Sequence, residues 1–113
     1  MKIKTRDRDD IAILDISGEI TIGQGDVQLR KEINELVNNK EIVNIILNLS
    51  KVSFIDSSGI GEIVRSYTTV QKHGGKLKLM GLESKVRDLL TITQLITVFE
   101  CFEGEEEAVA SYK

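Results

Sequence analysis

The middle of the chain carries an apolar strand pattern that is followed closely by an amphipathic helix pattern. Residues 43–49 have the sequence Val-Asn-Ile-Ile-Leu-Asn-Leu, a short β-branched run that is typical of a buried strand. From Ile60 to Tyr67, apolar residues recur at intervals of three and four, which predicts one buried face of a helix. Residues 56–59, Asp-Ser-Ser-Gly, lie between the two patterns. A carboxylate and two hydroxyls therefore stand where a strand is followed by a helix.

The start of a helix has two physical properties that matter here. Its first backbone N–H groups lack intrahelical partners, and the aligned peptide dipoles add partial positive charge. Such a position suits an anion, or a serine that becomes one by phosphorylation. It also suits simple capping by Asp56 or Ser57, because Asp and Ser are among the commonest N-cap residues. Taken alone, this stretch favours capping over chemistry.

The flanking segments predict an alternation of strands and helices. Strands are expected over residues 3–6, 11–16, 43–49, 76–80 and 98–102, and helices over 27–38, 57–73, 84–93 and 105–112. The first two strands form a predicted antiparallel hairpin, and a glycine-containing loop follows over residues 17–26. Asp26 is the predicted N-cap of the next helix, and Gly74 is expected to end the helix that begins at Ser57.

Strands that alternate with helices of this length predict βαβ units with right-handed crossovers. We therefore expect an α/β fold, a small mixed β-sheet with helices packed against it. The chain has 113 residues, 41% of them hydrophobic, with no proline, internal repeat or linker, so we expect a single domain over residues 1–113. Sites in such sheets collect at the carboxyl ends of strands, where residues 56–59 are predicted to lie.

Charge and hydropathy argue against two kinds of partner. The net charge is -3 and the Lys and Arg residues are scattered, so we expect no nucleic acid partner. No apolar run approaches the roughly 20 residues that a membrane-spanning helix needs, and Met1–Lys4 is not followed by the apolar core of a signal peptide. We therefore expect no membrane partner and a cytoplasmic location.

Residues suited to metal or redox chemistry are few. Cys101 is the only cysteine, cannot form a disulfide within the chain, and is expected to be a buried, inert thiol. Glu103 and residues 105–107 could gather a hard cation, but a charge run near a terminus is more often a solvated helix face. We expect no metal and no cofactor.

The serines also lack the surroundings of an enzyme nucleophile. The only histidine, His73, lies at the far end of the same predicted helix, about 24 Å from Ser57 at 1.5 Å per residue. The sequence has neither a G-x-S-x-G motif nor a glycine-rich phosphate loop. We therefore expect that the protein is not an enzyme, and that another protein can modify its exposed hydroxyl.

Several segments closely resemble the STAS domain of bacterial anti-sigma factor antagonists. The most specific is Val52–Gly61, which contains the Asp-Ser-Ser-Gly block directly after an apolar strand. The resemblance also covers residues 17–20, 47–49, 74–77, 86–90 and 98–99.

The resemblance implies a non-catalytic regulator that binds an anti-sigma factor, which is also a serine kinase, and thereby frees a sigma factor. Ser57 aligns with the phosphorylation site of the family, and a serine phosphatase would reverse the modification. ATP would belong to the kinase. The contact surface that the resemblance implies comprises Asp56, Ser58, Gly59, Ile60, Thr21 and Gly23.

The resemblance departs from the family pattern at Thr21, where many antagonists carry an acidic residue. Asp26 is a candidate for a partial replacement of that charge. The Thr21-Ile22-Gly23 variant also suggests relatives in stressosome-like or other partner-switching modules. The alternative function is therefore a scaffold subunit that associates with itself or with related domains, regulated at the same serine.

Overall fold

Five strands form one mixed sheet in the computed structural model, which describes residues 1–113. β1 (Lys2–Arg8) and β2 (Ile11–Ile20) form the predicted antiparallel hairpin. β2 then pairs in parallel with β3 (Asn44–Ile55), so the sheet changes from antiparallel to parallel at β2. The parallel part continues through β4 (Lys76–Met80) and ends at β5 (Cys101–Phe102). The prediction of a small mixed sheet is confirmed.

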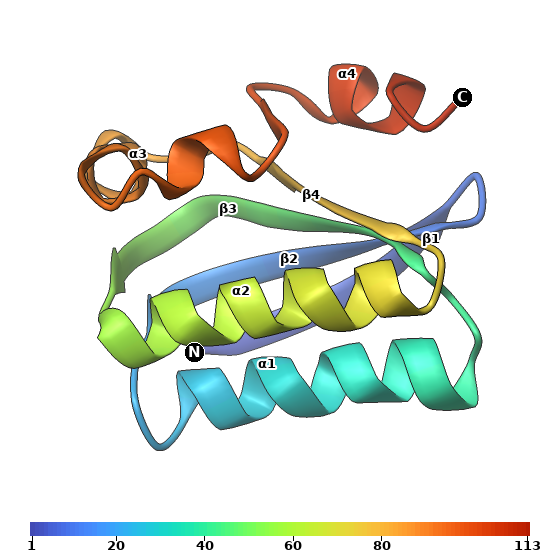
Figure 1. Ribbon diagram of the computed structural model, residues 1–113, viewed down its shortest axis with the longest axis horizontal. Coiled ribbons are helices and arrows are strands. Elements are labelled where there is room, and N and C mark those ends of the chain that lie inside the picture. The colour runs from blue at the N-terminus through green and yellow to red at the C-terminus, as the bar shows by residue number, and fades with distance from the viewer.

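Three helices cover one face of this sheet. They are α1 (Gly25–Asn34), which continues through a π-helical turn (Glu35–Asn39), α2 (Ser57–Lys72) and α3 (Ser84–Ile92). Figure 1 shows α1 and α2 side by side, both beginning at the end of the sheet where β2 and β3 end. A 3-10 turn (Leu95–Thr97) then leads toward β5. None of the helices combines the length and the hydropathy that a membrane-spanning segment requires.

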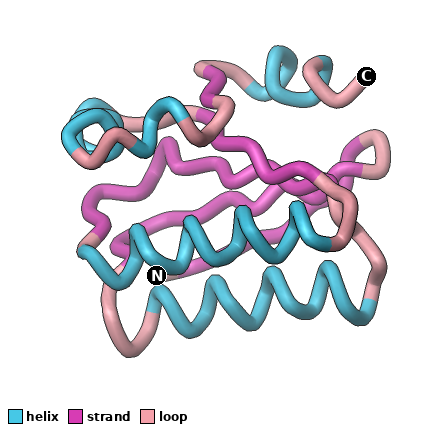
Figure 2. Tube along the Cα trace, in the orientation of Figure 1, coloured by secondary structure: helices cyan, strands magenta, loops and turns pink.

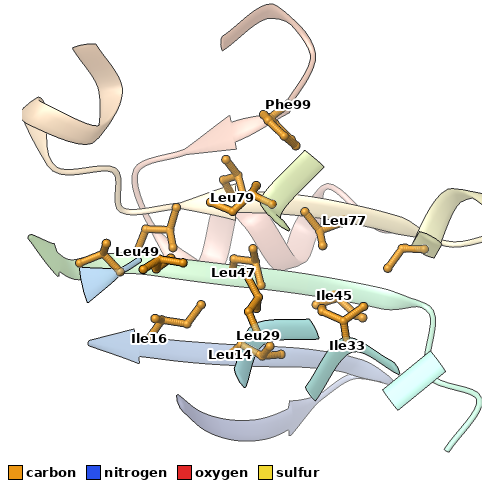
Figure 3. Packing of buried hydrophobic residues seen from close by; sticks show 14 of the residues in the cluster. Leu14, Ile16, Leu29, Ile33, Ile45, Leu47, Leu49, Leu77, Leu79 and Phe99 are labelled. Atoms are coloured by element: carbon orange, nitrogen blue, oxygen red, sulfur yellow. The ribbon is translucent and has the colours of Figure 1, made fainter. Parts of the chain in front are cut away.

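The main hydrophobic core lies between the sheet and these three helices. It contains 20 buried residues, among them Ile45, Leu47 and Leu49 of β3, whose alternate side chains face the same side. Figure 3 shows Leu14 and Ile16 of β2 and Leu77 and Leu79 of β4 in the same cluster as these residues. Aliphatic side chains from three adjacent strands thus form one continuous surface on which the helices pack.

α4 (Glu105–Ala110) covers part of the opposite face of the sheet, apart from the other helices (Figure 2). Its Ala108 and Val109 pack on a smaller cluster that includes Ile46. Beneath it, Lys78 of β4 is only 2% exposed, and its ammonium group donates to the Ser111 hydroxyl at 2.9 Å and lies 4.3 Å from the centre of the Tyr112 ring. The alternating Leu and Lys residues predict this strand correctly, but its central lysine is buried because α4 lies over it.

The acidic run at the start of α4 forms ion pairs with β1. Glu105 accepts from Arg6 and Arg8, and Glu106 accepts from Arg8. Arg6 also binds Asp15 of β2, with 2.6 Å between Nε and Oδ2. These contacts fix the position of the C-terminal helix, and they engage two of the carboxylates that the sequence offered as candidate cation ligands.

Several predicted element boundaries are wrong. β3 continues from Leu49 to Ile55, and β2 continues through Gly18 to Ile20, in a segment predicted as loop. Register shifts in the β2–β3 ladder interrupt the regular alternation in both extensions, which obscured the strand pattern. The last strand contains only Cys101 and Phe102, because residues 98–100, which directly follow the 3-10 turn, form a turn and bend instead of a strand.

Candidate functional site

The side chain of Asp56 connects three elements at the carboxyl end of the sheet. It caps α2, because Oδ1 accepts from the backbone N–H of Gly59 at 2.8 Å. Its second oxygen, Oδ2, accepts from the backbone N–H of Ile22 at 3.0 Å, in the loop between β2 and α1. These N–H bonds, that of Gly59 first, lower the pKa of Asp56 below its ordinary value. The predicted capping role is confirmed for Asp56, which is ionised at neutral pH.

Two glycines allow both helices to begin against the same strand residue. A Cβ atom on Gly59 would lie 2.2 Å from the carbonyl oxygen of Ile20, and one on Gly25 would lie 2.8 Å from the Ile20 Cα. Both distances are shorter than non-bonded atoms can tolerate, so any side chain at either position would push a helix away from β2. The first turns of α1 and α2 therefore pack on the backbone of Ile20.

The loop after β2 is held by a second carboxylate. Asp26 Oδ1 accepts from the backbone N–H groups of Gly23 at 2.9 Å and Val27 at 2.7 Å. Asp26 lies inside the first turn of α1, and Gln24 precedes the helix, so the prediction that Asp26 is the N-cap is wrong. The helix begins at Gly25, which packs closely on Ile20, and so starts two residues earlier than the sequence pattern suggests. Gly23 has φ +87°, a left-handed conformation that favours glycine.

The structure brings the predicted contact residues to one end of the sheet. Ile20 and Ile55 are paired at the ends of β2 and β3, and residues 21–23 and 56–60 follow them directly. Ser57 is exposed, Ser58 and Ile60 are half-buried, and Gly59 is buried. Thr21 is half-buried and accepts at its carbonyl from the Asp26 N–H at 3.2 Å. The structure explains Gly59 by packing, and its contact role remains a prediction.

Two exposed apolar side chains that the sequence reasoning did not single out lie next to these residues. Ile22 is 71% exposed and Phe54 is 51% exposed. Both are close to predicted contact residues along the chain: Ile22 stands between Thr21 and Gly23, and Phe54 stands two residues before Asp56. Large apolar side chains that stay in solvent beside a polar centre are typical of protein contact surfaces. Their sequence signal is apolar character outside the predicted strands and helices.

An ion pair between an exposed arginine and a buried carboxylate links α1 to α2 behind the site. Glu62 of α2 is 3% exposed, and its Oε1 accepts from Nη2 of Arg30 of α1 at 2.9 Å and from Nε at 3.0 Å. The carboxylate raises the pKa of Arg30 through these hydrogen bonds. A buried carboxylate that lost its cationic partner would be strongly unfavourable, so the pair holds the two helix starts in a fixed relation.

The geometry gives Ser57 no base within this chain. α2 is continuous from Ser57 to Lys72, and His73 follows at its other end, where its ring nitrogen Nδ1 lies 2.8 Å from the carbonyl oxygen of Thr69. Cys101 is half-buried on β5, away from the serines, and burial raises the pKa of its thiol, which keeps it protonated. The site therefore offers an exposed hydroxyl at a capped helix start, without a nucleophile–base pair.

Comparisons with known proteins agree with this architecture. The STAS domain family model matches residues 2–108. The anti-sigma-B factor antagonist of Listeria monocytogenes is 32% identical over 107 residues, which cover 95% of this chain and 91% of that protein. An anti-sigma factor antagonist from Mycobacterium paratuberculosis has a similar fold, with a TM-score of 0.84 at 20% identity over 97% of this chain and 92% of the other.

A second similar structure is that of the Bacillus cell fate determinant SpoIIAA in the phosphorylated form. Its TM-score is 0.78 at 20% identity, and the match covers 99% of this chain and all of that one (100%). The family match spans most of the chain, and so does the alignment with the Listeria protein. The protein therefore belongs to the STAS-domain family of anti-sigma factor antagonists.

Proposed function

We propose that the protein is an anti-sigma factor antagonist that binds an anti-sigma factor with serine kinase activity, and that phosphorylation of Ser57 releases it. The unmodified protein would hold the anti-sigma factor and free a sigma factor in the cytoplasm. A serine phosphatase would restore binding. The protein itself catalyses no reaction in this proposal, and the kinase supplies the ATP site.

One observation carries the proposal: Ser57 is exposed as the first residue of α2, in a family of antagonists. An exposed hydroxyl can enter the active site of a kinase without unfolding of the helix. A phosphate there would meet the partial positive charge of the helix start, so the fold should accept it. A protein of similar fold has been solved in a phosphorylated form, which supports this expectation.

The release step follows from charge. The ionised carboxylate of Asp56 already accepts the Gly59 N–H, and a phosphate on Ser57 would add about -1.5 to -2 charges beside it. A partner surface that fits the neutral hydroxyl would then face a concentrated negative charge. An unmatched charge in an interface typically costs about 2–5 kcal/mol, which corresponds to a loss of about 30-fold or more in affinity.

The apolar part of the contact would come from Ile22 and Phe54. Both side chains are largely exposed. The backbone of Ile22 donates to Asp56, and Phe54 lies two residues before Asp56 in the chain. Apolar anchors surrounded by polar residues are the usual source of affinity in protein interfaces. In this proposal Ile22 and Phe54 supply affinity for the partner, and phosphorylation of Ser57 lowers that affinity.

The decisive experiment compares partner capture from the source cell by wild type, Ser57→Ala and Ser57→Asp. We expect wild type and Ser57→Ala to recover the same kinase-type anti-sigma factor, and Ser57→Asp to recover at least tenfold less. Thr68→Ala is the matched control, because it removes an exposed hydroxyl of α2 that lies outside the predicted contact surface and leaves Ser57 in place. Equal recovery by all four proteins would refute the switch.

The site of modification can be tested separately. Incubation of the purified protein with the recovered kinase and ATP, followed by mass spectrometry, should place phosphate on Ser57. Phosphate on Ser58, or on Ser57→Ala protein at the wild-type rate, would contradict the assignment.

A specific observation favours the alternative of a scaffold subunit. Thr21 places a hydroxyl where many antagonists carry a carboxylate, and the nearby Asp26 carboxylate is occupied by the N–H groups of Gly23 and Val27. The loop therefore presents less negative charge than a typical antagonist would, which suits a different partner or a related domain. The size of the protein in solution separates these functions.

A further inference from the structure

α4 covers only part of its face of the sheet. The uncovered part of that face contains the largest hollow of the molecule. It has a volume of about 670 Å3, and its lining includes Lys2, Lys4, Ser17 and Lys51. Hollows that bind small molecules commonly have volumes of about 300–1,000 Å3. This one is polar, and it is separate from Ser57, which does not line it.

Strand register arranges its side chains in two rows. Lys2 of β1 pairs with Ser17 of β2, which pairs with Lys51 of β3. Neighbouring strands are about 4.8 Å apart, so the two lysine backbones stand about 10 Å apart with the Ser17 hydroxyl between them. In the adjacent row, Lys4 pairs with Asp15. Three lysines thus lie in the same row as Ser17 or in the adjacent row.

A β-bulge is responsible for the position of Lys51. Leu49 and Val52 are both fully buried in the main core, although residues three apart in a regular strand point to opposite faces. The register shifts between Asp15 and Ser17, and two successive residues, Ser50 and Lys51, are exposed. A β-bulge changes the face of the sheet to which the following side chains point, and bulges are frequent next to active sites. Without it, Lys51 would point toward the helices.

The charge of the hollow is positive although the whole chain carries -3. Four cationic residues line it, against one carboxylate, Asp15. That carboxylate is already satisfied, because it accepts from Arg6 Nε at 2.6 Å, from Arg6 Nη2 at 3.1 Å and from Asn48 Nδ2 at 2.8 Å. None of the three lysines has an acidic partner within ion-pair distance.

A purely structural explanation covers only part of this arrangement. β1 is an edge strand, and lysines on edge strands hinder pairing with other chains. That explains Lys2 and Lys4. It does not explain Lys51, which lies on the central strand β3 and reaches the open face only through the bulge.

We propose that this hollow, defined by Lys2, Lys4, Ser17 and Lys51, binds a compact anion that carries two or more phosphate groups. Lysine ammonium groups bind phosphate as point charges, and the serine hydroxyl can donate to a phosphate oxygen. No aromatic side chain lines the hollow, so it has no platform on which a nucleic acid base could stack. The group would come from a free polyphosphate compound or from a phosphorylated lipid headgroup.

The test is calorimetric titration of the full chain with inorganic tripolyphosphate at low ionic strength, where charge interactions are least screened. The triple variant Lys2→Gln/Lys4→Gln/Lys51→Gln should lose at least about tenfold in affinity. The control Lys31→Gln/Lys40→Gln/Lys72→Gln removes the same charge from lysines outside the hollow, and its affinity should stay within about twofold of wild type. Equal weakening by both triple variants would overturn the proposal, as would the absence of saturable binding to wild type. Unchanged urea midpoints would show that the variants are folded.

A second arm distinguishes the sources of the phosphate. Co-sedimentation with phosphatidylcholine vesicles that contain cardiolipin, whose headgroup carries two phosphate groups, would identify a lipid headgroup if it is lost in the first triple variant and kept in the control. Tripolyphosphate binding without co-sedimentation would identify a free compound.

Discussion

Gly59 and Gly61 lie two residues apart in α2 and have opposite structural roles. The backbone of Gly59 touches the carbonyl oxygen of Ile20, whereas a Cβ atom on Gly61 would have no neighbour within 4 Å. Gly61 is exposed on the helix surface. Glycine loses more conformational freedom on folding than other residues do, so glycine at this position lowers stability. The same residue type therefore serves close packing at one position and is dispensable at the other.

We expect Gly59→Ala to lower the free energy of unfolding by about 1–3 kcal/mol, because the added methyl group must displace α2 from β2. Gly61→Ala should raise it by about 0.5–1 kcal/mol, because alanine is the better helix former. Urea unfolding at neutral pH measures both. Equal effects of the two substitutions would show that α2 does not pack on Ile20 as described.

At the scale of elements, α4 is joined to the sheet by polar contacts as well as by its small apolar cluster. The hydroxyl of Tyr112 donates at 2.8 Å to the carbonyl oxygen of Ile45 and lies 2.9 Å from that of Lys76, so it links the C-terminal segment to β3 and β4. Burial raises the pKa of this tyrosine. The hydroxyl of Tyr67 makes no such bond, although its ring packs edge-on against Phe99.

Tyr112→Phe should therefore lower the free energy of unfolding by about 1–2 kcal/mol, through the loss of these hydrogen bonds. Tyr67→Phe removes the same hydroxyl from a ring whose packing it leaves intact, and should change stability by less than about 0.5 kcal/mol. Thermal or urea unfolding of the two variants provides the comparison. A larger effect at Tyr67 would contradict the proposed attachment of α4.

The ion pairs between β1, β2 and α4 make the stability of the protein depend on pH. Hydrogen bonds from Arg6 lower the pKa of Asp15 and of Glu105 below their ordinary values of 3.8 and 4.5. Because the folded pKa is depressed, the stabilisation is fully present well above pH 4.5 and is lost as the pH falls through and below this range.

Arg6→Gln should be less stable than wild type by about 1 kcal/mol at pH 7, the order expected for a part-exposed network, and the difference should shrink below about pH 4.5. Urea unfolding between pH 7 and pH 3 measures it. Arg65→Gln is the control, because Arg65 is exposed and forms no ion pair, so its curve should follow that of wild type. A difference for Arg6→Gln that stays constant with pH would show that the carboxylates are not its origin.

At the scale of the whole molecule, the two proposed functions differ in assembly. A soluble antagonist of 12.6 kDa should elute as a monomer or dimer, whereas a scaffold subunit should form a species in the megadalton range. Light scattering coupled to size-exclusion chromatography distinguishes these outcomes. We expect the small species, and we expect Ser57→Asp to have the same size and urea midpoint as wild type, because the modified residue lies outside the core.

The sequence predicts the order of elements well and their ends less well. Residues 43–49 and the stripe after Ile60 are regular, so the central strand and helix follow from periodicity alone. The second half of β3 is irregular, because a bulge places Ser50 and Lys51 on one face, and no periodic template recognises it. The start of α1 depends on contact between Gly25 and Ile20, a tertiary contact that local preference cannot reveal.

The candidate site likewise contains some features that local sequence predicts and others that depend on tertiary contacts. Capping by Asp56 is local and was predicted, whereas its second bond, to the N–H of Ile22 34 residues away, requires the fold. The burial of Lys78 likewise depends on α4, which lies more than two dozen residues further along the chain. Sequence reasoning finds features that a few neighbouring residues determine, and it misses those that two distant segments create together.

The packing of Gly25 and Gly59 on Ile20 has a consequence for how such proteins diversify. The scaffold of this end of the sheet is set by main-chain contacts, while Ile22, Phe54 and Ser57 project from it without supporting the core. The outward residues can therefore mutate with little loss of stability. After gene duplication, two copies could acquire different partners through changes at these outward residues alone. Each copy would then act in a separate signalling pathway, and both would keep the same fold.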